Sequence, residues 1–101
     1  MGFFDYIFGV KKRQVQLYLD NGATILDVRS QREWDSGHID KAVHIPLDEL
    51  RNRLAEVKQL KKPIVVCCES GVRSAKAAKY LNLENIDATN GGGWVRLQKK
   101  L

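Results

Sequence analysis

One stretch of the sequence decides the fold: Ile64-Val65-Val66-Cys67-Cys68-Glu69-Ser70-Gly71-Val72-Arg73-Ser74-Ala75. It begins with a short run of apolar, mostly β-branched residues, which is the composition of a fully buried strand. The run ends on two cysteines. A polar loop that contains Gly71 follows, and then an alanine- and lysine-rich segment, 74–81, with strong helix propensity. The stretch therefore predicts a buried strand, a tight loop that begins at Cys68, and a helix.

The position of Cys68 would suit an anionic nucleophile. The first backbone N–H groups of a helix have no partner within the helix, and with the helix dipole they stabilise a nearby negative charge. We therefore expect the pKa of the Cys68 thiol to be lowered. Ser70 and Gly71 let the backbone curl so that several N–H groups point inward, and Gly71 can adopt a positive φ at little cost.

Three charged or polar side chains of the loop have distinct expected roles. Arg73 is the one fixed cation of the loop, and it either braces the loop through a salt bridge or binds the substrate. Ser74 is expected to cap the following helix, and a hydrogen bond to the Cys68 sulfur is considered as an extra role. The Glu69 carboxylate opposes ionisation of the neighbouring thiol unless it points to solvent.

The rest of the chain alternates helical and strand patterns. Helices are expected at about 12–20, 31–35, 47–60, 74–83 and 94–101, strands at 23–28, 42–45 and 64–67, an edge strand at 85–89 and a turn at 90–93. Val15, Leu17 and Tyr18 are expected on the buried face of the first helix. Strands separated by helices predict an α/β fold, with a central parallel sheet of four to five strands and helices on both faces. Ligands bind at the carboxyl ends of such strands, where the Cys68 loop lies.

Length and composition predict one domain, and we divide the chain into an N-terminal extension, 1–11, and a domain, 12–101. The formal net charge of +5 comes from scattered Lys and Arg residues, without the basic helix face or binding motif of a nucleic-acid-binding protein. Residues 1–10 lack a basic start and a cleavage site, and they are too short to span a bilayer. We expect them to form a packed turn rather than a weak membrane contact. Two adjacent cysteines are unsuited to a disulfide and fit a reducing compartment, so we expect a cytoplasmic protein. We expect it to be a monomer or a weak dimer.

Four pieces of the chain, in this order and at this spacing, resemble a single-domain rhodanese, a sulfurtransferase homology domain. They are Leu26-Asp27-Val28-Arg29 with Glu33-Trp34, Gly37-His38-Ile39 with Ala42 and Ile45-Pro46-Leu47, the loop 68–74, and Gly91-Gly92-Gly93-Trp94. The resemblance covers residues 12 to 98. It implies a three-layer rhodanese-like α/β fold and a persulfide carried on Cys68.

The resemblance also implies the substrates and the binding residues. Family members take a sulfane sulfur from thiosulfate, releasing sulfite, or from another persulfide donor, and pass it to cyanide or a thiol acceptor. The anion cradle would be formed by the rest of the loop: Glu69, Ser70, Gly71, Val72, Arg73 and Ser74. Because Glu69 places a negative charge beside the thiolate, we expect thiosulfate to be a poor donor compared with a neutral or protein-bound persulfide.

Cys67 offers a rival interpretation. Cys67 and Arg73, followed by a serine, have the C-x5-R outline of a protein tyrosine phosphatase loop, and rhodaneses share a fold with a class of cell-cycle phosphatases. Val66 stands where a phosphatase has His, however, and the loop holds no general-acid Asp. Phosphatase or arsenate reductase chemistry is therefore disfavoured. A non-catalytic binding or redox module is the other alternative to sulfur transfer.

The other chemically notable side chains are expected to have structural roles. Cys67 is expected to be a small buried hydrophobe, with a resolving thiol for a Cys68 persulfide as the alternative. Arg29 is expected to pair with Glu33 and brace the following turn. His38 is expected to be a hydrogen-bonded structural histidine rather than a base. No zinc-ligand spacing is present, so neither a metal nor another cofactor is expected.

Overall fold

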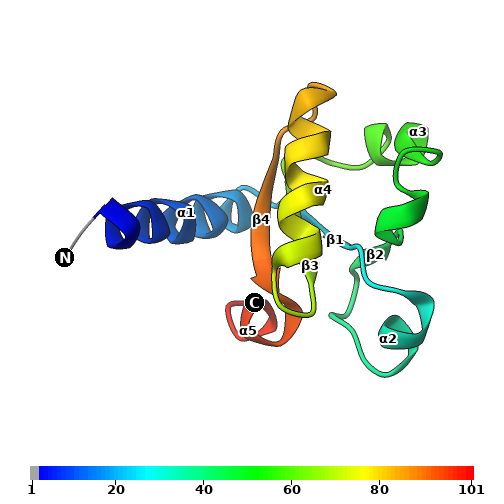
Figure 1. Cartoon of the computed structure of the whole chain (residues 1–101), viewed down its shortest axis with the longest axis horizontal. Coiled ribbons are helices and arrows are strands. Elements are labelled where there is room, and N and C mark those ends of the chain that lie inside the picture. The colour runs from blue at the N-terminus through cyan, green and yellow to red at the C-terminus, as the bar shows by residue number, and fades with distance from the viewer. Residues whose placement is uncertain (1–2) are drawn as a thin grey trace.

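The computed structural model describes the backbone of residues 3–101 and the side chains from residue 12 onward. In chain order the elements are α1 (Phe3–Asp20), β1 (Thr24–Asp27), α2 (Gln31–Asp35), β2 (Val43–His44), the 3-10 turn η1 (Leu47–Glu49), α3 (Leu54–Lys58), β3 (Ile64–Cys68), α4 (Val72–Leu83), β4 (Ala88–Gly93) and α5 (Trp94–Gln98) (Figure 1). The strands form one parallel sheet of four strands in the order β2-β1-β3-β4. The α/β prediction is confirmed, with four strands.

The strand β3 lies at the centre of the sheet and is buried along its whole length. It pairs with β1 on one side, where Asp27 is opposite Cys67, and with β4 on the other, where Ile64 is opposite Ala88. Successive residues of a strand point to opposite faces, so the two cysteines contribute to different layers of the core. Its apolar composition thus explains its central position.

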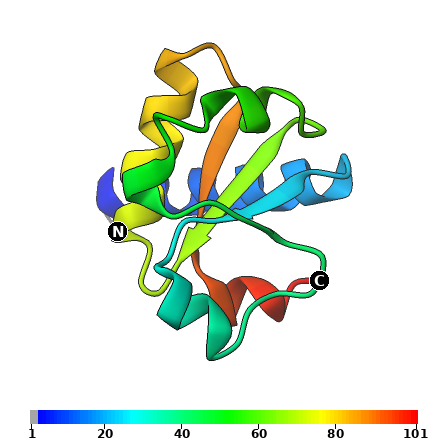
Figure 2. The ribbon, with the colours of Figure 1, turned by 90° about the vertical axis from the view of Figure 1, so that its right-hand side faces the viewer.

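The core has two layers, one on each face of the sheet. On one face, side chains of β1 and β3 pack against the segment from η1 to α3 and against α4. The buried residues from these parts of the chain are Leu50, Val57, Ala77, Ala78 and Leu81. On the other face, β3 packs against α1 and α5 through Val15, Val65, Cys67 and Leu97. Figure 2 shows α1 behind the strands and α4 on the near side.

The first helix is longer than expected. It begins at Phe3, so residues 3–10 are helical where we expected a turn, and its first part projects beyond the sheet (Figure 1). Whether the side chains of residues 1–11 pack on the domain lies outside the described part of the chain. Val15 is buried and Tyr18 partly buried, but the prediction for Leu17 is wrong, because its side chain is 58% exposed and Leu19 packs on the core instead. None of the described helices combines the length and the apolar composition that crossing a membrane requires.

The expected helix 47–60 is two separate pieces, η1 and α3. Its apolar stripe does face the core, with Leu50 and Val57 buried. Arg53 interrupts the helix with φ −113° and ψ 23°, and its guanidinium binds Glu49 and Glu56 on either side. An apolar spacing of three residues suits a 3-10 turn as well as an α-helix, so the pattern alone did not distinguish one helix from two.

The expected turn at 90–93 is also wrong, because these residues continue β4. The glycines serve close packing there. A Cβ atom on Gly91 would lie 2.6 Å from Val65 Cγ1, and one on Gly93 would lie 2.7 Å from the Glu69 carbonyl oxygen. Only Gly92 of the three has a positive φ, +83°, where the pairing with β3 shifts register. The glycine run therefore lets the loop after β3 lie directly against the backbone of β4.

Candidate active site

The loop that follows β3 occupies the carboxyl end of the sheet. Both views place it at the end of the molecule where α2 and α5 lie (Figures 1 and 2). Gly71 turns the chain into α4 with φ +104°, a value that side chains other than glycine rarely adopt. A Cβ atom at Gly71 would also lie 3.3 Å from the Gly92 Cα atom. Backbone conformation and close packing both require glycine at this position.

The loop wraps around the sulfur of Cys68. The Gly71 N–H donates to Sγ at 3.0 Å and the Ser74 N–H at 3.3 Å, and the Ser74 hydroxyl lies 3.2 Å from the same atom. Burial alone would raise the pKa of Cys68, but the hydrogen bonds from Ser74, Gly71 and the Ser70 backbone outweigh it, so the pKa is lowered. Cys68 has no exposed surface, so the site keeps bulk water away from the sulfur. The arrangement stabilises a thiolate.

Ser74 does not cap α4, which is a correction to the sequence prediction. It is the third residue of the helix, and the cap position belongs to Gly71, whose side chain offers no hydrogen bond. The Ser74 hydroxyl instead donates to Asn90 Oδ1 at 2.6 Å while facing the sulfur. A hydroxyl has one proton, so the Asn90 oxygen and a Cys68 thiolate compete for it. Asn90 Oδ1 also accepts from the Gly92 N–H at 2.9 Å, so it retains a donor when Ser74 turns toward the sulfur.

Sequence reasoning missed Asn90. Its Nδ2 donates to the Gly71 carbonyl at 3.0 Å, so this one side chain holds both the glycine corner of the loop and the Ser74 hydroxyl. An asparagine before three glycines is typical of a turn, which concealed its role as a strand residue that faces the loop. Asn is uncommon in strands, and this could have marked Asn90 as a residue with a specific role.

Arg73 braces the loop. Its guanidinium donates to both carboxylate oxygens of Glu33, at 2.6 and 2.9 Å. Because of these hydrogen bonds the pKa of Glu33 falls to about 2. Glu33 also completes a capping box with Ser30 at the start of α2, so one carboxylate fixes the helix and the loop together. Of the two roles considered for Arg73, the geometry shows the salt bridge.

Arg29 does not form the expected ion pair with Glu33. Its Nη2 lies 2.8 Å from Asp27 Oδ2, and both side chains are buried. It also donates to the backbone oxygens of Glu33 and Gly37, so it holds the chain around α2 by its carbonyl groups. The prediction failed because Asp27, at the end of β1, is closer in sequence and presents both carboxylate oxygens to the guanidinium.

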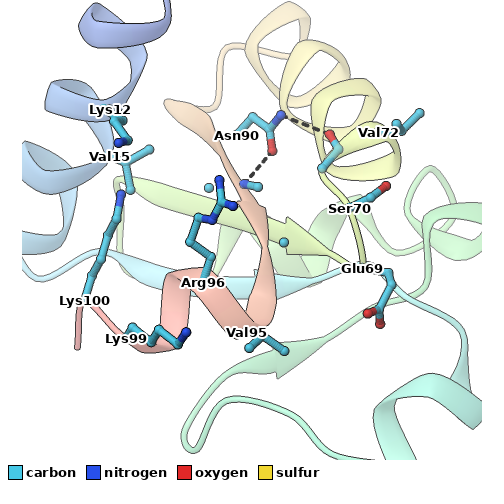
Figure 3. Close-up of a pocket in the computed structure, with 14 residues that line it drawn as sticks. Lys12, Val15, Glu69, Ser70, Val72, Asn90, Val95, Arg96, Lys99 and Lys100 are labelled. Carbon is cyan, nitrogen blue, oxygen red and sulfur yellow. Dashed lines mark hydrogen bonds between the residues drawn. The ribbon is translucent and has the colours of Figure 1, made fainter.

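The other predicted loop residues lie at the surface. The Glu69 side chain is 58% exposed, and one carboxylate oxygen lies 3.7 Å from Arg29 Nη1. Ser70 and Val72 are exposed as well. These three residues and Gly71 form one wall of a pocket of about 760 Å³, and residues 90–93 of β4 form another (Figure 3). The loop thus presents its backbone to the sulfur and its side chains to the pocket.

Cys67 lies on the opposite face of the sheet from Cys68, in the layer with Val15 and Leu97. Burial, together with the nearby Asp27 carboxylate, raises the pKa of Cys67 to about 12. A thiol that is protonated at neutral pH and faces away from the loop is not placed to resolve a Cys68 persulfide or to act as a phosphatase nucleophile.

His38 and His44 flank the Trp34 ring. The ring centroids of Trp34 and His38 are 3.6 Å apart in a parallel stack, and those of Trp34 and His44 are 4.7 Å apart. His38 Nδ1 lies 2.8 Å from the Trp34 carbonyl oxygen, and His44 Nε2 lies 2.7 Å from the Arg29 carbonyl oxygen. Both histidines thus support the segment around α2.

The comparisons with known families and proteins agree on one family. The Rhodanese-like domain model matches residues 12–99. The thiosulfate sulfurtransferase GlpE of Pseudomonas syringae is 31% identical over 86 residues, which cover 82% of this chain and 80% of that protein. The tRNA uridine(34) hydroxylase of Photorhabdus laumondii is 33% identical over 92 residues, 82% of this chain but 26% of the hydroxylase. The chain spans less than half the length of several of the curated relatives that it matches.

A solved structure agrees with these sequence relatives. The human single-domain sulfurtransferase TSTD1 superposes with a TM-score of 0.63 and 29% sequence identity, over 81% of this chain and 86% of that one. This structural match covers most of both chains, so the likeness concerns the whole fold and not the loop alone.

The Ser74→Ala variant is expected to raise the pKa of Cys68, because the thiolate loses a hydrogen-bond donor. Alkylation by iodoacetamide, followed against pH, should have its midpoint at higher pH and be roughly tenfold slower at pH 7, the size expected of a hydrogen bond to a charged group. Ser74→Thr should restore the profile. Ser70→Ala is the matched control, because only the backbone of Ser70 contributes to the sulfur site. Superimposable profiles for Ser74→Ala and the wild type would contradict the assignment.

Proposed function

The chain belongs to the Rhodanese-like domain family, and we propose that it is a sulfurtransferase that carries a sulfane sulfur as a persulfide on Cys68. The observation that carries the proposal is the convergence of the Gly71 and Ser74 N–H groups and the Ser74 hydroxyl on one sulfur atom. A group that attacks a sulfur donor must be a thiolate, and these donors hold it in that form.

The proposed cycle has two displacements. In the first, the Cys68 thiolate attacks the outer sulfur of the donor, a new S–S bond forms, and the old S–S bond breaks. The leaving group departs with the electron pair, as sulfite from thiosulfate or as a thiolate from a persulfide. In the second, an acceptor thiolate or cyanide attacks the outer sulfur of the Cys68 persulfide, and the Cys68 thiolate is released. No external oxidant or reductant enters either step.

The loop stabilises the Cys68 thiolate both before it attacks the donor and when the persulfide releases it. The same N–H groups that stabilise the free thiolate lie around the sulfur when it returns as a leaving group. Arg73 contributes through its salt bridge with Glu33, which fixes the loop so that these groups keep their direction. A thiolate nucleophile requires a reducing compartment, and both described cysteines are free thiols, so we propose a cytoplasmic location.

Incubating the reduced protein with thiosulfate, and separately with a persulfide donor, tests the proposal. Intact mass and peptide mapping should show a gain of one sulfur atom on Cys68, and cyanide or a thiol should remove it. Cys68→Ser should gain nothing, whereas Cys67→Ser should load fully, because Cys67 faces the other side of the sheet. Absence of loading by either donor would overturn the proposal in favour of a non-catalytic module.

The Glu69 carboxylate is expected to make thiosulfate a poor donor. Glu69 borders the pocket and is only loosely paired with Arg29, at 3.7 Å, so its charge repels a compact dianion that approaches Cys68. Glu69→Gln should raise kcat/KM for thiosulfate about fivefold at low ionic strength, and the gain should shrink as salt is added.

Glu84→Gln is the matched control for this charge change. Glu84 is exposed and lies at the far end of α4, about 18 Å along the helix from the loop. It should leave kcat/KM for thiosulfate unchanged. If Glu69→Gln shows no gain over this control, the carboxylate does not limit thiosulfate use.

A further inference from the structure

The strand β4 lies at one edge of the sheet, and the hydrogen bonds around it show which of its residues face outward. The Ile64 N–H donates to the Asp87 carbonyl oxygen at 2.9 Å, so Asp87 faces β3. Residues of a parallel ladder alternate between facing the neighbouring strand and facing away from it, so Ala88 and Asn90 face outward. The Asn82 side chain confirms this for Ala88, because it accepts from the Ala88 N–H at 3.0 Å and donates to the Ala88 carbonyl oxygen at 2.9 Å.

The backbone of Asn90 is the next outward pair of groups, and it lacks such a cap. Among the described residues, nothing is hydrogen-bonded to its N–H or its carbonyl oxygen, and its side chain binds the loop instead. The three glycines that follow carry no side chain that could cover the edge. An unpaired strand edge is the surface to which another extended chain adds. The outer edge of β4 at residues 90–93 therefore has the form of a docking site for a strand.

A pocket of about 760 Å³ lies along this stretch of the edge, and residues 90–93 line it. Figure 3 shows β4 running between α1 and the loop after β3 and continuing into α5. An extended segment placed beside β4 would occupy this pocket. Cys68 does not line the pocket, so an occupant would bind beside the loop and would not need to reach the sulfur.

One side of the pocket is basic. The helices α1 and α5 cover the same face of the sheet, and Arg96, Lys99 and Lys100 line the pocket from the region of α5 (Figure 3). We call these three residues the α5 cations. Within the described part of the chain, none of them forms an ion pair with a carboxylate. Charge complementarity therefore favours acidic side chains on this side of an added strand.

The other side of the pocket has a different character. It is formed by the loop and the start of α4, and there the Val72 side chain is 62% exposed beside the hydroxyl of Ser70. Glu69, the one acidic residue that lines the pocket, also lies on this side (Figure 3). Its carboxylate would repel an acidic side chain brought next to it. This side therefore favours an apolar side chain.

We infer that the outer edge of β4 docks an extended segment of a partner protein in which acidic and apolar side chains alternate. Such a segment would exchange hydrogen bonds with the Asn90 backbone as an added strand. Successive side chains of a strand point to opposite faces, so the acidic ones would meet the α5 cations and the apolar ones would meet Val72. A second copy of this chain fits the edge less well, because pairing β4 with β4 would bring the α5 cations of both copies together.

Two capped pentapeptides of equal composition and charge test the inference: Glu-Val-Glu-Val-Glu, which alternates, and Glu-Glu-Glu-Val-Val, which does not. Binding is followed through the amide resonances of the 15N-labelled protein at low ionic strength. The alternating peptide should give saturable shifts at residues 90–93 and 96–100, slow the hydrogen exchange of the Asn90 amide, and bind about fivefold more tightly than the block peptide. Equal affinity for the two peptides, or an Asn90 amide that gains no protection, would overturn the inference.

The variant Arg96→Gln/Lys99→Gln should weaken binding of the alternating peptide about fivefold, and added salt should reduce the difference from the wild type. Lys58→Gln/Lys79→Gln is the matched control. Both of its lysines are exposed and lie outside the pocket, and it lowers the formal net charge by the same two units. It should bind like the wild type. Equal weakening in the two double variants would show a general effect of net charge and would contradict a docking site at this edge.

Docking and sulfur transfer can fail separately. Cys68→Ser should bind the alternating peptide like the wild type, because Cys68 does not line the pocket. Peptide binding by a protein whose Cys68 accepts no sulfur would overturn the proposed function and leave the docking site standing. Loading of Cys68 without binding of the alternating peptide would do the reverse. Shifts of the Asn90 amide that depend on protein concentration, in the absence of peptide, would assign the edge to a second copy of the chain and overturn the acidic partner.

Discussion

The structure depends on the convergence of backbone N–H groups on the Cys68 sulfur. A buried thiolate is unfavourable unless donors replace the water that it loses. Here the backbone N–H groups of Gly71 and Ser74 are the donors. Both point at the sulfur because Gly71 has a positive φ and α4 begins immediately after it. The loop also needs Gly93 of β4, because a side chain at this position would clash with the loop backbone.

Two interactions with distant parts of the chain keep the loop in this form. Asn90, from the edge strand β4, binds the Gly71 carbonyl and the Ser74 hydroxyl. Glu33, from α2, binds Arg73 with both oxygens. Each links the loop to a neighbouring element, so the chemistry of one sulfur is fixed by three separate segments. The side chains that remain, above all Glu69, line the pocket and make no hydrogen bond that shapes the loop among the described contacts.

The local parts of this design were predictable from the sequence, and the non-local parts were not. A run of apolar β-branched residues, a glycine and a helix-forming segment are sufficient to place β3, the loop and α4. The partners of Arg29 and Ser74 depend on which segments the fold brings together, so the predicted pair with Glu33 and the predicted helix cap were both wrong. The glycines at 91–93 were assigned to a turn because sequence shows their freedom of conformation but not the close contact with Val65 and Glu69 that demands them.

The most direct test of the thiolate cradle is a pH titration of the Cys68 13Cβ resonance in the wild-type protein. Cys67 should give no step in the same range, because its pKa lies at about 12. If the loop stabilises the thiolate, Cys68 will titrate below the ordinary value for a cysteine thiol, about 8.5. A midpoint at or above that value would mean that burial outweighs the hydrogen bonds, and the loop would then not be a device for holding an anionic sulfur.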